Sequence, residues 1–290
     1  MIIKNFTLIL IFLSLVLSVC AAKPAKSETV TSHKDSYIVW NAEKDSSDDL
    51  ENSQVLKFQT SFKSKLRSWP KNKSPDQDDE MNKIFFAFSL QSIWDISSPS
   101  IPMLDITFNP EFFYQLNLKN ITPEKNSLLN CLRFGIEHES NGKDGPSSRS
   151  WNKAYFQVQR LCKPYDKKKE FNGYFNGYIK LWVPFAISDK NKDITDFIGY
   201  YELRGEYKHP LINFFGIKLD DWIHLGLTVR HGAGISRQLN GNFQFDLKWL
   251  FDNDDPLALY IQFWRGYGEN LLEYNQFQES KAKLGLSLNW

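Results

Sequence analysis

The sequence predicts an all-β fold, a single transmembrane antiparallel β-barrel of about twelve strands. Segments of roughly ten residues recur along the chain, and apolar and polar side chains alternate within each of them. Alternation with a period of two gives a strand one apolar and one polar face. The apolar faces are rich in Phe, Leu and Trp. Such faces are typical of strands that meet lipid on one side and a polar interior on the other.

The N-terminus predicts export to the cell envelope. A single lysine precedes an apolar run at residues 6–19, and small residues follow it. The run is too short for a spanning helix and is typical of a secretory signal peptide, here residues 1–22, with cleavage expected after Ala21 or Ala22. The polar residues 23–35 are then expected to form a flexible N-terminal segment.

The remaining residues, 36–290, are predicted to form the barrel domain. The alternation is clearest where Phe243, Phe245 and Leu247 share one face and the side chains between them are polar. The alternating segments are 36–42, 53–66, 83–96, 103–118, 128–139, 151–162, 174–186, 196–208, 221–230, 242–251, 256–266 and 280–290. A secreted β-sandwich or soluble barrel would also alternate, but the abundance of Phe, Leu and Trp on the apolar faces favours an outer-membrane barrel. The even strand number and the aromatic C-terminus also fit such a barrel.

The charge balance gives no support for a nucleic-acid partner, because 35 basic and 34 acidic residues leave a net charge of +1. Of the three cysteines, Cys20 lies in the predicted signal peptide, where its lipidation is an open alternative. Cys131 and Cys162 remain in an exported chain, which permits a disulfide. Counted from His138 and Asn152, however, they face opposite sides of paired strands, so we expect no bridge between them.

A histidine, a serine and an asparagine flank one polar loop near the middle of the chain. His138 and Ser140 are two residues apart, so in a strand they point to the same face. If the chain turns at the Gly/Pro/Ser-rich loop and returns antiparallel, Asn152 arrives beside His138. Such a constellation combines a nucleophile, a general base and an amide that orients the imidazole.

The same alternation places these three side chains on the outer wall of the predicted barrel. They continue two apolar stripes, which in a barrel face lipid. With the N-terminus in the periplasm, the fifth strand runs outward, and the loop 139–150 then lies at the extracellular rim. An acyl ester in the outer leaflet of the membrane could reach the three side chains at this place.

The stretch His138–Asn152, with the sequence HESNGKDGPSSRSWN, resembles the active-site stretch of the outer membrane phospholipase A family. Residues 92–94, 109–111, 193–201 and 266–275 are also similar to that family. The resemblance implies a barrel in the bacterial outer membrane. It also implies a calcium-dependent phospholipase of the A1/A2 type, active on lysophospholipids as well, that hydrolyses phospholipid acyl esters.

Carried over to the matching positions, the resemblance implies a role for each residue. Ser140 would be the nucleophile, His138 the base, and Asn152 the group that holds the imidazole tautomer. The backbone N–H of Gly142 would help to form the oxyanion hole.

The resemblance further implies Ca2+ bound between the subunits of a homodimer. The carbonyl of Lys143 and the hydroxyl of Ser148 would be ligands. Ser100 of the partner subunit would complete the set, with Ser97 or Ser98 as alternatives. All of these are hard oxygen ligands, which suits calcium. The implied partners are therefore a phospholipid substrate, a second copy of the chain and outer-membrane lipid.

The other titratable residues near these strands are interpreted as structural. Glu139 faces away from His138 and is expected to be a lumen charge, and Asp144 a solvated loop charge. His224 is expected to face the lumen and His231 to lie in the loop that follows its strand. Two rival functions stay open. One is a passive porin-like barrel, and the other is a catalytically inactive relative that binds lipid or calcium.

Overall fold

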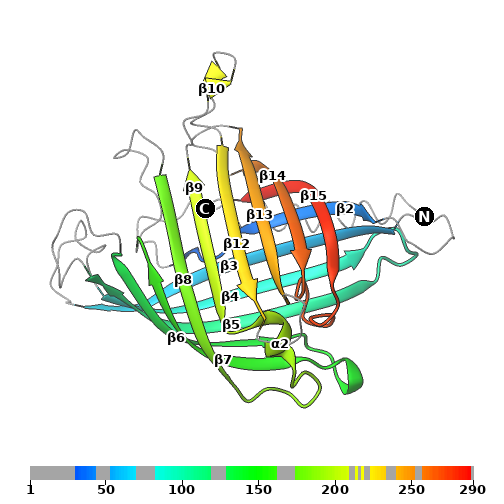
Figure 1. The fold of residues 1–290 in the computed structure, drawn as a ribbon, viewed down its shortest axis with the longest axis horizontal. Coiled ribbons are helices and arrows are strands. Elements are labelled where there is room, and N and C mark those ends of the chain that lie inside the picture. Colours follow the sequence, from blue (N-terminus) through cyan, green and yellow to red (C-terminus); the bar gives the residue numbers. More distant parts are fainter. Residues whose placement is uncertain are drawn as a thin grey trace.

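The computed structural model is a closed antiparallel β-barrel (Figure 1). It describes residues 30–43, 53–69, 82–118, 129–161, 174–208, 213–214, 217–218, 223–232, 240–251 and 257–288. The predicted signal peptide and Cys162 lie outside these residues. The predicted all-β barrel fold is confirmed.

Twelve strands form the wall, and each pairs with the wall strands that precede and follow it, the last with the first. They are β2 (Ser36–Glu43), β3 (Ser53–Trp69), β4 (Asn82–Asp95), β5 (Met103–Asn117), β6 (Cys131–Ser140), β7 (Ser150–Gln159), β8 (Tyr174–Phe185), β9 (Tyr201–Lys208), β12 (Ile223–His231), β13 (Gly241–Leu250), β14 (Leu257–Gly266) and β15 (Gln278–Leu288). The barrel closes where β15 pairs with β2, with Leu288 opposite Ser36. A separate hairpin pairs β10 (Asn213–Phe214) with β11 (Ile217–Lys218).

The strand bounds agree with the predicted segments to within a few residues, with one exception. The sequence predicts a strand from residue 196, whereas the chain forms the helix α2 (Ile194–Ile198) before β9 begins at Tyr201. Both terminal isoleucines of α2 are buried, because residues four apart lie on the same face of a helix. Among the described residues, no helix is long and apolar enough to cross a membrane.

The chain before the first wall strand is built into the barrel. β1 (Val30–Ser32) pairs with β3 beyond the end of β2, so the two short strands share one edge of β3. Residues 30–35 are therefore held in place, whereas the sequence predicts a flexible segment over residues 23–35. The prediction is wrong for these six residues because backbone pairing and lumen contacts, which composition does not reveal, hold them.

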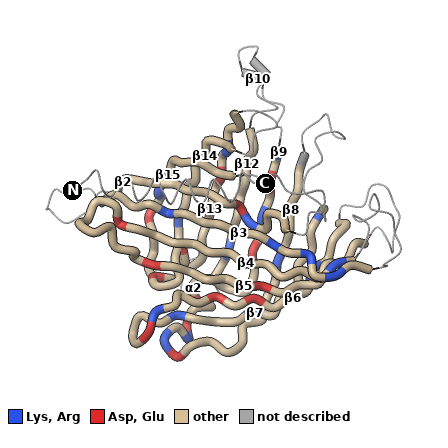
Figure 2. Tube along the Cα trace, turned by 180° about the vertical axis from the view of Figure 1, so that it is seen from behind, with Lys and Arg blue, Asp and Glu red and all other residues tan. Residues whose placement is uncertain are grey.

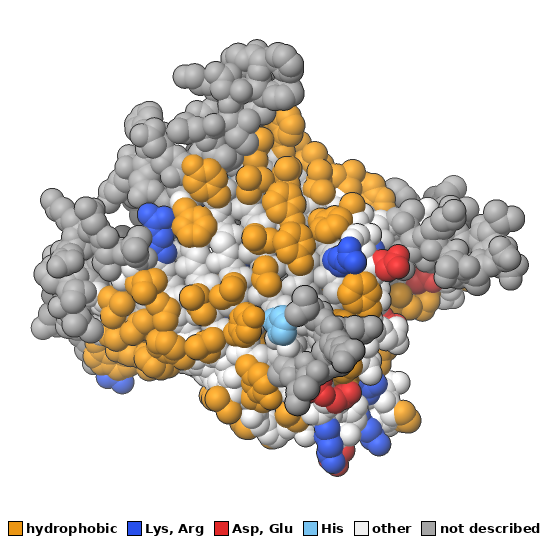
Figure 3. Space-filling view, viewed as in Figure 1, with side chains coloured by type: hydrophobic (Ala, Val, Ile, Leu, Met, Phe, Trp, Pro, Cys, Tyr) orange, Lys and Arg blue, Asp and Glu red, His pale blue; other side chains and the backbone are white. Residues whose placement is uncertain are grey.

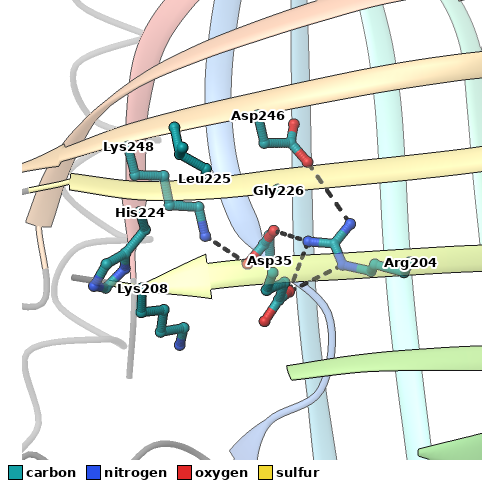
Figure 4. A pocket seen from close by; sticks show the side chains of 9 residues that line it. Asp35, Arg204, Lys208, His224, Leu225, Gly226, Asp246 and Lys248 are labelled. Atoms are coloured by element: carbon teal, nitrogen blue, oxygen red, sulfur yellow. Dashed lines mark hydrogen bonds and ion pairs between the residues drawn. The ribbon is translucent and has the colours of Figure 1, made fainter. Parts of the chain in front are cut away.

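Polar side chains of this segment contact distant parts of the lumen wall. His33 Nε2 lies 2.9 Å from a carboxylate oxygen of Glu111 on β5. Asp35 accepts hydrogen bonds from Arg204 on β9 at 2.8 Å and from Lys248 on β13 at 2.6 Å, and Figure 4 shows its carboxylate between these two cations. Because a charge removed from water needs a partner, these contacts hold the N-terminal segment in the barrel interior.

Alternate residues of the wall face outward or into the lumen. Large apolar side chains gather over the outer surface (Figure 3), and Val183 on β8 is 70% exposed in the absence of lipid. Charged residues lie on the inner face, where Lys57, Glu137 and Lys283 are nearly fully buried. Figure 2 shows acidic and basic residues close together on neighbouring strands. An apolar outer face and a polar interior are the arrangement expected of a barrel surrounded by lipid.

The rim near α2 holds an apolar cluster that joins two loops to the wall. Trp151 and Trp182 pack with Ile194 and Ile198 of α2 and with Leu271 and Tyr274 of the loop after β14. Trp182 Nε1 donates a hydrogen bond to the Gly199 carbonyl at 2.9 Å. Burial, together with its hydrogen bond to Asp193, raises the pKa of the Tyr274 phenol. The cluster therefore fixes both loops beside the connection between β6 and β7.

The buried Cys131 at the start of β6 is disulfide-bonded, and its partner lies outside the described residues. The expectation that Cys131 forms no bridge is therefore wrong. The parity argument counts strand positions as far as Cys162, but β7 ends at Gln159. Alternation fixes the direction of a side chain only within a strand, so the count does not extend to Cys162.

Candidate functional site

The hairpin of β6 and β7 brings the predicted site residues together. In its register His138 faces Asn152 and Ser140 faces Ser150. The loop 141–149 connects the two strands at the rim. Because His138, Ser140 and Asn152 occupy alternate positions of facing strands, they share the outer face with the exposed side chain of Ile136. The predicted position on the outer wall is therefore observed.

His138 and Asn152 make the central contact of the site. His138 Nδ1 lies 2.9 Å from Asn152 Oδ1, and Asn152 Nδ2 donates to the carbonyl of Ala186 at 3.3 Å. A carbonyl only accepts, so Ala186 fixes which end of the Asn152 amide carries the N–H groups. The amide oxygen then faces His138, which places the imidazole proton on Nδ1 and leaves Nε2 able to accept a proton.

Ala186 is a site residue that sequence reasoning misses. It follows β8 directly and has φ 46°, in the left-handed region that residues other than glycine rarely adopt. This conformation turns its carbonyl toward Asn152. No alternation or motif indicates such a backbone acceptor, because it depends on one dihedral angle at a strand end.

Ser140 lies at the end of β6, beside His138 on the same face. Its hydroxyl makes no hydrogen bond to any described residue, and Phe108 of β5 faces it across the ladder. Catalytic hydrogen bonds are often long or open in the absence of substrate. The hydroxyl is therefore available to a substrate that approaches along the outer wall.

The loop after Ser140 is ordered by a buried asparagine. Asn141 Oδ1 accepts the backbone N–H of Arg149 at 2.9 Å, and Asn141 Nδ2 donates to the Ser147 carbonyl at 2.8 Å. A 3-10 turn, η3 (Gly145–Ser147), occupies the middle of the loop. These bonds hold the backbone of the 141–149 loop in one compact conformation.

Gly142 turns the chain directly after this asparagine. Its φ of 63° is left-handed, and a Cβ at this position would lie 3.0 Å from the ring of Phe108. Glycine is therefore the residue that fits here.

The predicted calcium ligands are hydroxyl and carbonyl oxygens of two rim loops. The Ser148 and Ser100 hydroxyls make no hydrogen bond among the described residues. The Ser97 and Ser98 hydroxyls, by contrast, both donate to Asp95. Within the described part of the chain, no group of three His, Cys, Asp or Glu side chains could hold a metal ion.

The Lys143 side chain contacts β5. Its ammonium donates to the Leu104 carbonyl at 2.5 Å and lies 3.9 Å from Asp105. The Asp105 carboxylate is buried and also accepts the backbone N–H groups of Leu271 and Leu272, at 3.1 and 2.9 Å. These contacts tie the 141–149 loop to β5 and to the loop after β14.

The lumen face behind the site is a network of paired charges. Glu137 accepts a hydrogen bond from Lys180 at 2.7 Å and also pairs with Lys153. Glu139 pairs with Lys153 at 2.9 Å and accepts the indole N–H of Trp151. Glu139 is thus a lumen charge, as predicted, and these contacts support the inner face of the strand that carries His138.

A family model described as phospholipase A1 matches residues 26–288. The chain belongs to the phospholipase A1 family. The phospholipases A1 of Escherichia coli K12 and Salmonella typhimurium are each 27% identical to it over 205 residues. A putative phospholipase A1 of Neisseria meningitidis is 25% identical over 240 residues. The matches with the first two cover 70% of this chain and 61% of the relative, so the chain spans less than two thirds of their length.

Solved structures of this family have the same fold. Outer membrane phospholipase A from Escherichia coli is 23% identical with a TM-score of 0.67, over 90% of this chain and 98% of that one. The Salmonella typhi enzyme, solved as a dimer with bound calcium, is 22% identical with a TM-score of 0.68, over 92% and 94%. The predicted family is confirmed, and the family and the barrel place the chain in the bacterial outer membrane.

Proposed function

We propose that this chain is a calcium-dependent phospholipase of the A1/A2 type that also cleaves lysophospholipids. The observation that carries the proposal is the 2.9 Å contact between His138 Nδ1 and Asn152 Oδ1 on the outer wall. Ser140 stands two residues further along the same face, where the apolar wall ends at the rim. An acyl ester that reaches this height in the outer leaflet would meet a base and a nucleophile together.

In the proposed reaction Ser140 Oγ attacks the ester carbonyl while His138 Nε2 takes its proton. The C–O bond to the lysophospholipid then breaks, and His138 returns the proton to the departing oxygen. Water, deprotonated by the same imidazole, releases the fatty acid from Ser140. Asn152 keeps the proton on Nδ1 and accepts the stronger hydrogen bond that the imidazolium donates.

The loop 141–149 would stabilise the negative charge on the carbonyl oxygen. The N–H of Gly142 follows Ser140 closely in the chain, and the left-handed turn at Gly142 supports its assignment to the oxyanion hole. The Lys143 carbonyl and the Ser148 hydroxyl would hold Ca2+ beside it. When bound, Ca2+ would supply positive charge next to the developing oxyanion.

Ser100 of a second copy of the chain would complete the calcium ligands. Asp95 engages the hydroxyls of Ser97 and Ser98, which favours Ser100 over these two alternatives. The dimeric, calcium-bound state of the Salmonella typhi structure supports the same arrangement. Association would then act as a switch, and equal activity of a cross-linked dimer and an enforced monomer would contradict it.

The side chains inside the lumen are evidence against the porin-like alternative. Polar and charged side chains that reach the lumen from the N-terminal segment contact residues of β5, β9 and β13. A water-filled channel would need this space free of side chains. The inactive alternative is not favoured by any residue, since Ser140, His138 and Asn152 are all present.

The experiment is fatty-acid release from phospholipid micelles by refolded protein, with calcium and with a chelator. We expect Ser140→Ala to lower the rate by about a thousandfold or more, because covalent catalysis needs its hydroxyl. Ser150→Ala is the matched control, since Ser150 faces Ser140 in the hairpin and should tolerate the change. Calcium-independent release, or an active Ser140→Ala protein, would contradict the proposal.

A further inference from the structure

The ladder between β5 and β6 is interrupted directly beside His138. Phe108 faces Ser140 and Glu111 faces Glu137, so the register is the same on both sides of the interruption. In this register Pro110 falls opposite His138. The two facing pairs between these positions are absent from an otherwise continuous ladder.

The proline explains the interruption. In an antiparallel ladder, alternate facing pairs exchange both of their N–H···O=C bonds, and Phe108 with Ser140 and Pro110 with His138 are such alternate pairs. Proline has no N–H, so the strand cannot donate to the His138 carbonyl at this point. A backbone acceptor left without a donor beside a catalytic base would weaken the end of β6.

A side chain replaces the missing donor. Asn109 Nδ2 donates to the His138 carbonyl at 2.8 Å, and Asn109 itself is buried. Lys34 Nζ lies 2.6 Å from Asn109 Oδ1. An ammonium only donates, so it identifies that end of the amide as the oxygen and directs the N–H groups toward His138. The N-terminal segment, through Lys34, thus orients a group that supports the main chain of the site.

We propose that Asn109 is a positioning residue that substitutes for the N–H removed by Pro110 and holds the backbone of His138 in place. This inference rests on the proposed function, because it assigns a role to the segment that carries both base and nucleophile. Ser140 is only two residues from His138, so a shift of this backbone moves both groups relative to Asn152. Displacements of this kind lower turnover without changing the chemistry of the reacting groups.

The test compares Asn109→Ala, Pro110→Ala and the double variant with the unmodified chain, using fatty-acid release from phospholipid micelles with saturating calcium. We expect Asn109→Ala to lower kcat about tenfold and to leave KM unchanged. Pro110→Ala alone should stay close to the original activity. In the double variant the new N–H of residue 110 can donate to the His138 carbonyl, so most of the lost kcat should return.

The rescue separates positioning from other structural effects. Loss of the contact with Lys34 occurs equally in the single and the double variant, so recovery can come only from the restored ladder bond. An Asn109→Asp variant provides an isosteric control, because a carboxylate cannot donate to the carbonyl, and it should lose at least as much kcat as Asn109→Ala.

Additive kcat effects in an active enzyme would overturn the role of Asn109 and leave the proposed function intact. Full activity of Asn109→Asp would also overturn that role. An unmodified chain that releases no fatty acid would overturn the proposed function instead. The free energy of unfolding of the unmodified chain, the two single alanine variants and the double variant would then still be informative. It would report whether the Asn109 side chain and a backbone hydrogen bond from residue 110 replace each other.

Discussion

Two histidines lie near the rim, at the ends of two strands that run in the same direction, and their neighbours differ. On β6, His138 faces the amide of Asn152, with 2.9 Å between Nδ1 and Oδ1. On β12, the ring of His231 is stacked on that of Tyr201, which begins β9, with 6.4 Å between centroids and an angle of 2°. His231 belongs to the strand itself, whereas the sequence places it in the following loop.

The difference separates the proposed base His138 from a histidine at a similar position on the wall. The exposed side chain of Leu227 marks the outer face of β12, and His231 lies four residues further along it. His231 has an aromatic ring as its neighbour. The residue two positions after it is alanine, which carries no hydroxyl. His138 has an acceptor that fixes its tautomer and a serine two residues ahead. We therefore expect the facing strand and the residue at i+2, and not the position on the wall, to decide whether a histidine acts as a base.

The largest difference in fatty-acid release is expected between two variants in which one or the other histidine is replaced by alanine. His138→Ala should lower fatty-acid release by about three orders of magnitude, because general acid–base catalysis is lost and Ser140 has no base. His231→Ala should retain activity within a factor of about two, since only a ring contact is removed. Rates measured on the two refolded proteins in parallel check this, and equal losses would contradict the assignment of the base.

Replacing the residues that face the two histidines should give a smaller difference in kcat. Asn152→Ala should lower kcat by about ten- to a hundredfold, because the imidazole loses the acceptor that fixes its orientation and tautomer. Tyr201→Ala, the matched change beside His231, should leave kcat unaltered. Steady-state kinetics with both variants test this. A larger loss in the Tyr201 variant would show that the rim near α2, and not the amide, controls turnover.

The loop after His138 offers a smaller effect on calcium. Asn141→Ala removes the side chain that bonds Arg149 and Ser147, so the carbonyl of Lys143 and the hydroxyl of Ser148 should lose their fixed positions. We expect the calcium concentration for half-maximal activity to rise about tenfold, as for other changes next to metal ligands. Asp144→Ala is the control, because Asp144 forms no capping hydrogen bond in the same loop. An unchanged calcium requirement in Asn141→Ala would exclude this loop as the binding site.

Sequence reasoning predicts the wall and the outward position of the site because both follow from a period of two. Strand parity and one turn are enough to bring together His138, Ser140 and Asn152. The same counting is wrong for Cys131, because it continues past the end of β7 at Gln159. It is wrong for residues 196–200 as well, where a spacing of four belongs to a helix.

The supporting groups could not be predicted, because they depend on contacts between distant strands. The amide of Asn109 meets the His138 carbonyl 29 residues away, and the Ala186 carbonyl meets Asn152 34 residues away. Neither contact changes the apolar pattern of its strand. Lys34 reaches Asn109 from a segment whose polar composition indicates flexibility. Such pairs are determined by register and by single dihedral angles, which one sequence does not specify.

The smallest effect on turnover, with a large effect on stability, is expected on the lumen face behind His138. Glu137 is 3% exposed and pairs with Lys180, Lys153 and Lys34. Glu137→Gln keeps the shape but leaves these cations without their shared anion, which should lower the free energy of unfolding by about 3 kcal/mol. The kcat of the folded fraction should fall less than in Asn152→Ala, because no group on the outer face moves.

Denaturant unfolding followed by tryptophan fluorescence measures the loss, and the exposed Glu279→Gln change controls for the removal of one negative charge. Equal stability of the two variants would mean that other lumen groups compensate for Glu137. A kcat loss as large as that of Asn152→Ala would mean that the lumen and outer faces of β6 are coupled. In that case the inner face of β6 would have more than a supporting role, and the proposed division between a catalytic outer face and a supporting inner face would be wrong.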